Sequence, residues 1–83
     1  MTWDELKKQG SQHYKTGGIE PIDLLRGITP HDTLSALDVK ALSDNIKYST
    51  RMLIAGANER DCNKIIHYTE MVRVCLQEKK GER

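Results

Sequence analysis

The fold is decided by residues 38–78, which read DVKALSDNIKYSTRMLIAGANERDCNKIIHYTEMVRVCLQE. One stripe in its first half repeats at intervals of three and four, as in an amphipathic helix, through Val39, Leu42, Ile46, Ser49 and Leu53. We expect this helix to span 38–55, with Asp38 as its N-cap and Gly56 as its stop. A second helix is expected over 59–78, after Asn58, and its buried face is expected to comprise Cys62, Ile65, Ile66, Thr69, Val72 and Leu76. The short loop around Gly56 predicts an antiparallel helical hairpin.

Shorter elements precede this hairpin. The stretch Thr2-Trp3-Asp4-Glu5 has the spacing of a capping box, and Pro21 suits the first turn of another helix that ends at Gly27. The expected order is a short helix over 1–9, a glycine-rich polar loop over 10–18 and a second short helix over 20–27. The hairpin follows over 38–55 and 59–78, and a frayed tail over 79–83 ends the sequence. No segment alternates as a strand does. We therefore predict a single all-α domain over 1–83, with a long antiparallel helical hairpin and short N-terminal helices.

The size of the chain limits its core. With 83 residues, 37% hydrophobic residues and no Phe, a monomer would bury only about 60% of its unfolded surface. We therefore expect a homo-oligomer, in which association covers apolar surface that one chain leaves exposed.

The net charge of the chain bears on whether it binds nucleic acid. Acidic and basic residues nearly cancel, with a net charge of +1, which argues against binding to a nucleic-acid polymer. No apolar run is long enough to span a membrane, and the N-terminus resembles no signal peptide. We expect a cytoplasmic protein without a membrane partner.

Cysteine and histidine spacing predicts neither a disulfide nor a metal site. Cys62 and Cys75 are expected on one helix, about 20 Å apart, and they form no CxxC motif. We interpret both as small core residues. The histidines at 13, 31 and 67 lack the spacing of imidazole metal ligands.

The glycine-rich loop carries many functional groups in a short segment. The candidate ligand-binding residues there are His13, Tyr14, Lys15, Gly17, Gly18, Glu20 and Asp23. The two glycines permit a close approach to the backbone, and the following helix start attracts anions. Glu20 and Asp23 have two interpretations: they cap free amides, or they hold Mg²⁺ or a ribose hydroxyl. The loop therefore points to a small phosphorylated ligand.

The hairpin adds further candidates. Lys47 and Arg51 project from one helix face beside Tyr48, a combination suited to phosphate and a stacked base. The alternative is a solvated face on which Asp44 pairs with Lys47, or on which Tyr48 packs in the core. The same two interpretations apply to a second group, Arg60, Lys64, His67 and Tyr68. The GxxxxGKS or GxxxxGKT pattern of a P-loop is absent, so catalytic residues remain unknown.

These residues resemble a family of small tailed-phage proteins of unknown function, sometimes labelled SaV-like. The family pattern reads roughly HY..GxIExID, NAxKYxxR and DLxKAxxYL, and the similarity covers about residues 12–76. Some members are described as phage nucleotide kinases without a P-loop. The resemblance implies nucleotide binding and assigns the site to His13, Tyr14, Gly18, Glu20, Asp23, Lys47, Tyr48 and Arg51. The family's glycine-basic stretch is replaced here by Met52-Leu53-Ile54-Ala55-Gly56, which weakens the case for phosphoryl transfer more than that for binding.

Three functions of different classes follow. The first is sequestration of a nucleotide or nucleotide-derived signal, such as one made by host immunity, without turnover and with no cofactor. The second is a nucleoside-monophosphate kinase, which would require Mg²⁺. The third is a module that binds a host protein through Leu53 and Ile54.

Overall fold

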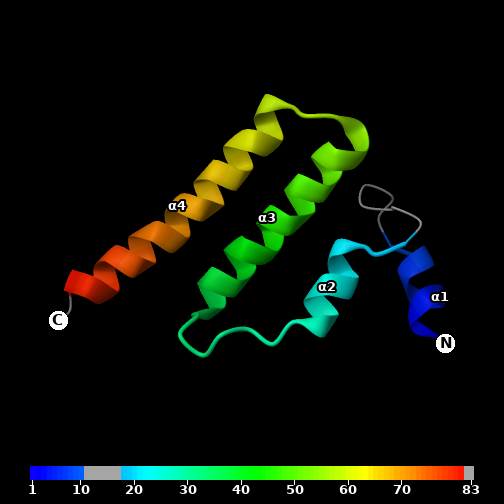
Figure 1. Cartoon of the computed structure of the whole chain (residues 1–83), viewed down its shortest axis with the longest axis horizontal. Coiled ribbons are helices and arrows are strands. Elements are labelled where there is room, and N and C mark those ends of the chain that lie inside the picture. Colours follow the sequence, from blue (N-terminus) through cyan, green and yellow to red (C-terminus); the bar gives the residue numbers. More distant parts are fainter. Residues whose placement is uncertain (11–17, 82–83) are drawn as a thin grey trace.

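The computed structural model describes residues 1–10 and 18–81, and within these ranges the chain is helical without a strand. Four helices follow one another: α1 Trp3–Lys8, α2 Pro21–Gly27, α3 Ala36–Ala55 and α4 Glu59–Gly81. The two long helices lie side by side and antiparallel (Figure 1). The predicted all-α fold with a long helix pair is confirmed.

Both long helices extend beyond their expected limits. Ser35 caps α3, because its hydroxyl accepts the Asp38 N–H at 3.2 Å while the Asp38 carboxylate accepts the Ser35 N–H at 3.0 Å. The prediction of Asp38 as N-cap is therefore wrong, and Asp38 stands three residues inside the helix. Residues 79–81 belong to α4 rather than to a frayed tail. Lys79 helps to hold them, because its ammonium donates to the Thr33 carbonyl at 2.7 Å.

The turn between the long helices depends on a glycine and an asparagine. Gly56 ends α3 with φ of 99° and ψ of 155°, and its N–H donates to the Met52 carbonyl at 2.9 Å. Asn58 then caps α4, since its side-chain carbonyl accepts the Asp61 N–H at 2.8 Å. This turn sets the two helices against each other.

The faces in contact differ from the predicted stripes. Ala41 is fully buried between the helices, whereas Leu53 is 87% exposed and Ser49 is exposed. On α4 the predicted core residues Cys62, Ile66, Thr69 and Leu76 are exposed, and only Ile65 and Val72 are partly buried. The side of α4 that turns towards α3 carries Asp61, Ile65, Tyr68, Val72 and Cys75. The α4 prediction is right for Ile65 and Val72 and wrong for the other four residues, because Asp61 and Tyr68, which have partners on α3, take part of the contact.

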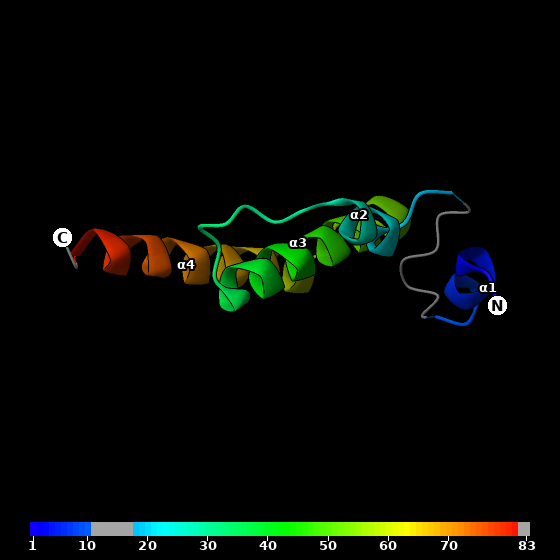
Figure 2. The ribbon, with the colours of Figure 1, turned by 90° about the horizontal axis from the view of Figure 1, so that it is seen from below.

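The two short helices, α1 and α2, lie to one side of the pair formed by α3 and α4. Helix α2 lies beside α3 on the side away from α4, and α1 lies beyond it (Figure 1). Trp3 Nε1 and Lys7 Nζ each donate to the Asp23 carboxylate at 2.7 Å, which attaches α1 to α2. Seen from below, the helices form little more than a single layer (Figure 2), with overall extents of 48 × 32 × 14 Å. None of the described helices is long and apolar enough to cross a membrane.

Candidate functional site

Helices α3 and α4 together carry a group of five basic side chains around two tyrosines. The cations, which we call the cationic surface, are Lys40, Lys47 and Arg51 on α3 and Arg60 and Lys64 on α4. Lys40 and Lys47 are seven residues apart, and Arg51 follows four residues later, so one side of α3 presents all three. The antiparallel partner helix adds the other two.

The tyrosines lie in the middle of this surface. The rings of Tyr48 and Tyr68 are stacked, with centroids 6.1 Å apart and planes 9° from parallel. The Arg51 guanidinium lies 5.3 Å from the Tyr48 centroid, and the Lys64 ammonium lies 5.8 Å from it. Both distances are those of cation–π contacts, which hold a cation against the ring face. The tyrosine pair thus joins the basic residues of the two helices.

A buried carboxylate lies beneath the lysines of α3. Asp44 is only 3% exposed, and it binds Lys40 Nζ at 2.6 Å and Lys47 Nζ at 3.1 Å. Burial acts to raise the pKa of Asp44, but hydrogen bonds from the two lysines outweigh it and hold the pKa below its ordinary value. The pairing of Asp44 with Lys47, one of the interpretations left open by the sequence, is confirmed. Asp44 stays ionised and fixes both ammonium groups.

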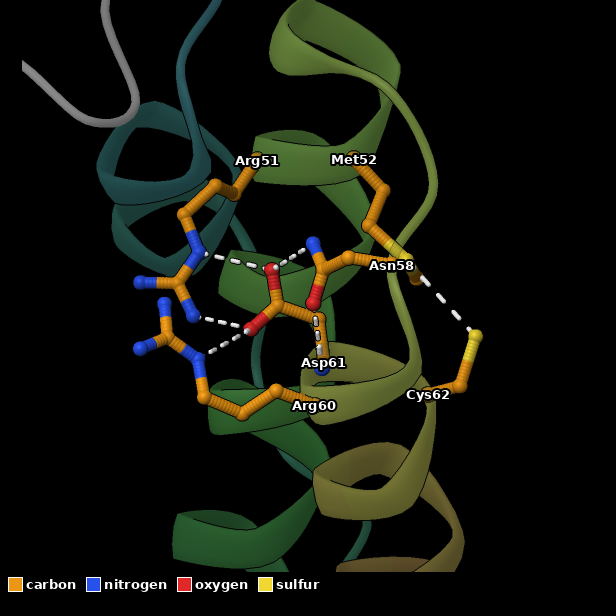
Figure 3. A network of polar contacts seen from close by, with 6 residues as sticks. All are labelled: Arg51, Met52, Asn58, Arg60, Asp61 and Cys62. Carbon is orange, nitrogen blue, oxygen red and sulfur yellow. Dashed lines mark hydrogen bonds and ion pairs between the residues drawn. The ribbon is translucent and has the colours of Figure 1, made fainter.

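A second buried carboxylate plays the same role for the arginines (Figure 3). Asp61 is fully buried, and its two oxygens accept a bidentate contact from Arg51, with the Nε–Oδ2 distance at 2.8 Å. The Asn58 amide donates to Oδ2 at 2.9 Å, and Arg60 Nε lies 4.0 Å from Oδ1. The hydrogen bonds from Arg51 and Asn58 lower the pKa of Asp61 to about 2. Asp61 therefore remains an anion at neutral pH and orients the Arg51 guanidinium.

The local charge remains positive despite these pairs. Five cations surround two carboxylates, and both carboxylates are buried while Lys40 and Arg60 reach largely into solvent. An incoming anion therefore meets the basic groups first, with the negative groups behind them. Such an arrangement favours ligands that carry several negative charges.

An apolar hollow of about 400 Å³ lies next to the cationic surface. It is lined by Leu37, His67, Glu70, Met71, Val74, Cys75 and Glu78. His67 connects the two, because its ring lies 5.7 Å from that of Tyr68. A ligand with an anionic part and a flat apolar part could therefore contact both features at once.

The predicted site residues fall into three groups. Lys47, Tyr48 and Arg51 lie together at the centre of the cationic surface. His13, Tyr14, Lys15 and Gly17 lie outside the described residues. Gly18 and Glu20 precede α2, where the Asp23 carboxylate accepts the Glu20 N–H at 2.9 Å. This hydrogen bond confirms the capping interpretation of Asp23, one of the two left open by the sequence. Lys7 and Trp3 also donate to its carboxylate, and the three contacts hold the pKa of Asp23 well below its usual range.

Lys40 is the site residue that the sequence analysis missed. The hydrogen bond to Asp44 raises the pKa of Lys40, and electrostatic interactions with Tyr68 and Tyr48 add to this effect. The spacing Lys40, Asp44, Lys47 places two bases and an acid on one helix face, and that spacing could have revealed it. Arg60, Lys64 and Tyr68 were noted from their spacing, but only the fold joins them to α3. Within the described residues, no group of three metal-ligating side chains occurs.

Comparison with known proteins gives one match. The family model described as a protein of unknown function (DUF3310) matches residues 8–70, which include the whole cationic surface and the tyrosine pair. No curated protein and no solved structure matches the chain. Because the match covers well over half of the sequence, this chain belongs to the DUF3310 family.

Proposed function

We propose that this protein binds a nucleotide or nucleotide-derived small molecule on the cationic surface and sequesters it without turning it over. The observation that carries the proposal is a stacked tyrosine pair with Arg51 and Lys64 against it, beside three further basic side chains that two buried carboxylates contact. Phosphate groups would bind Lys40, Lys47 and Lys64 and the guanidiniums of Arg51 and Arg60 through charge-assisted hydrogen bonds. The base would lie against Tyr68 and His67, with the apolar hollow beside them.

The carboxylates of the region favour binding over catalysis. Asp44 and Asp61 are each held by two cations, and Asp23 accepts hydrogen bonds from Trp3, Lys7 and the Glu20 backbone. Each of these acids therefore orients a neighbour in the free protein. In the sequestering function, no general base or metal is needed, because tight enclosure of the ligand is sufficient.

The alternative is a nucleoside-monophosphate kinase, which the sequence resemblance favours. It would have to hold two nucleotides in line with Mg²⁺. A third candidate is docking of a host protein at Leu53, which is 87% exposed at the end of α3. If the resemblance to tailed-phage proteins reflects the origin of this chain, the sequestered ligand would be a nucleotide signal of the infected cell, and the protein would act against host defence.

Equilibrium filtration with mass spectrometry separates these functions. The purified protein is incubated with mono-, tri- and cyclic nucleotides, with and without Mg²⁺, and the bound and free fractions are analysed. Sequestration predicts an unchanged nucleotide in the bound fraction in both conditions. New diphosphate in the filtrate would establish the kinase, and recovery of no nucleotide at all would contradict both and favour the docking module.

Variants connect binding to the cationic surface. Lys47→Gln and Lys64→Gln should each weaken binding by about tenfold or more, because each removes a cation beside Tyr48 or Asp44. Lys80→Gln is the matched control, since it makes the same change of charge near the exposed end of α4. Binding should also weaken as salt rises from about 0.05 to 0.5 M. Equal effects of all three variants would place the ligand elsewhere.

A further inference from the structure

The chain exposes far more surface than a compact protein of its mass. Its accessible surface is 6349 Å², whereas a folded monomer of 9.5 kDa exposes about 5,000 Å². Its radius of gyration is 15.0 Å, compared with about 12 Å for a compact domain of this length. The excess area of about 1,300 Å² is larger than the roughly 800 Å² that one partner buries in a standard interface.

Many apolar side chains contribute to this surface, because the described residues form almost no core. Among the residues that the structure describes, only Pro21 and Ala41 are buried apolar side chains. Thirteen large hydrophobic side chains are exposed. A layer of helices normally buries its apolar side against a second layer, and a thickness of 14 Å leaves room for only one. Within residues 1–10 and 18–81, no second layer of helices covers this apolar surface.

An apolar trough marks where that layer would lie. It runs between α2, the connection after α2 and α3, and it has a volume of about 330 Å³. Its apolar lining includes Leu25, Ile28, Leu34, Val39, Leu42 and Ile46, and no charged residue lines it. The trough lies on the side of α3 that faces α2, whereas the cationic surface lies towards α4, so an occupant of the trough leaves the cationic surface open.

We propose that this trough is covered by the same trough of a second copy of the chain, in a dimer with two-fold symmetry. Two observations favour a second copy over another protein. Burial of this apolar surface is needed to stabilise the fold, so the partner has to be present whenever the chain is. A second copy of the chain meets this condition. An uncharged apolar lining is also complementary to itself, since two-fold packing brings no like charges together.

Light scattering coupled to size exclusion tests the proposal over protein concentrations of about 5–200 µM. The expected mass is twice 9.5 kDa, or an even multiple of it. Leu42→Glu places a charge in the trough and should reduce the mass to that of one chain. Leu53→Glu is the matched control on the same helix, 87% exposed and outside the trough, and should keep the wild-type mass. A wild-type monomer, or an oligomer that Leu42→Glu leaves intact, would overturn the proposal.

A second measurement needs no substitution, in case Leu42→Glu fails to fold. Methyl-labelled and unlabelled wild-type chains are mixed, and isotope-filtered NMR detects contacts between copies. Intermolecular signals are expected at the methyl groups of Ile28, Leu42 and Ile46. Intermolecular signals confined to Ile66 and Leu76, on exposed α4, would show that the copies meet elsewhere and would refute this interface.

Discussion

Replacement of Gly56 by alanine tests the turn that brings the two halves of the candidate site together. Gly56 has φ of 99° and ψ of 155°, a combination that is almost restricted to glycine because a Cβ atom clashes with the local backbone. Arg51 lies five residues before this glycine and Asp61 five residues after it. The position of Gly56 therefore governs whether these two side chains can meet.

The expected loss of stability follows from the backbone alone. Beyond residue 56 and its two chain neighbours, no atom lies within 4 Å of an alanine Cβ at this position, so no packing clash with the rest of the fold adds to the cost. Holding a non-glycine residue in this region costs about 1–3 kcal/mol. For a domain of this size, 1 kcal/mol corresponds to a change in Tm of about 4–8 °C. Gly56→Ala should therefore lower the Tm by roughly 4–24 °C.

Thermal melts followed by circular dichroism measure this effect, at one protein concentration because association changes the Tm. Gly27→Ala is the matched control. Gly27 ends α2 without a positive φ, and its Cβ would also meet no atom within 4 Å. Since alanine is the better helix former, this control should keep or slightly raise the Tm. Equal melting of Gly56→Ala and the wild type would show that residue 56 does not hold this conformation in solution.

Two further predictions concern the contact between α3 and α4. The pKa of Asp61 is about 2 in the folded protein against an ordinary 3.8, so the stabilisation by its carboxylate is complete well above pH 4 and is lost as the pH falls towards 2. Urea titrations at several pH values should show that Asp61→Asn flattens this acid dependence of the unfolding free energy. An unchanged slope would contradict the assignment. Ala41→Leu should destabilise the fold by about 1–3 kcal/mol through overpacking, whereas Leu53→Ala should change it by less than about 0.5 kcal/mol because Leu53 is 87% exposed. If chemical denaturation showed a larger loss of stability for Leu53→Ala than for Ala41→Leu, Leu53 would be buried, as the sequence pattern predicted.

The existence and order of the helices were predictable because local chemistry determines them. Gly27 and Gly56 end helices, and Asn58 begins one with its side chain. The boundary at Ser35 was missed, since Ser35 and Asp38 are both good capping residues and only their reciprocal hydrogen bonds identify which one is the cap. Spacing alone cannot distinguish the two.

The buried side of the hairpin was less predictable, because hydrophobicity did not decide it. The α4 stripe through Ile66 and Leu76 assumed that apolar residues meet the partner helix. In the structure Asp61 occupies that contact, and a bidentate arginine and an asparagine amide neutralise and solvate its carboxylate. A carboxylate is buried only with such partners, and Arg51 lies on the other helix. The pair is therefore visible only after folding.

The same reasoning applies to the candidate site. Lys47, Tyr48 and Arg51 were found because they are neighbours on one helix. The link from Tyr48 to Tyr68 and Lys64 crosses between helices, and no spacing along the chain encodes it. Sequence patterns therefore identified the residues of each helix apart from Lys40, and the antiparallel packing joins the two groups into one surface.

The two proposals share a physical cause. The contact between α3 and α4 includes Asp61, Arg51 and the tyrosine pair as well as Ile65 and Val72. It therefore places the cationic surface over buried carboxylates but buries little apolar area. The hydrophobic residues of α2 and α3 consequently line the trough on the opposite side of α3. The polar residues between α3 and α4 support the candidate ligand site. Because they take the place of apolar residues there, a single chain buries very little hydrophobic core. A second copy on the trough would restore that core without covering the site, and folding and ligand binding would then depend on different sides of α3.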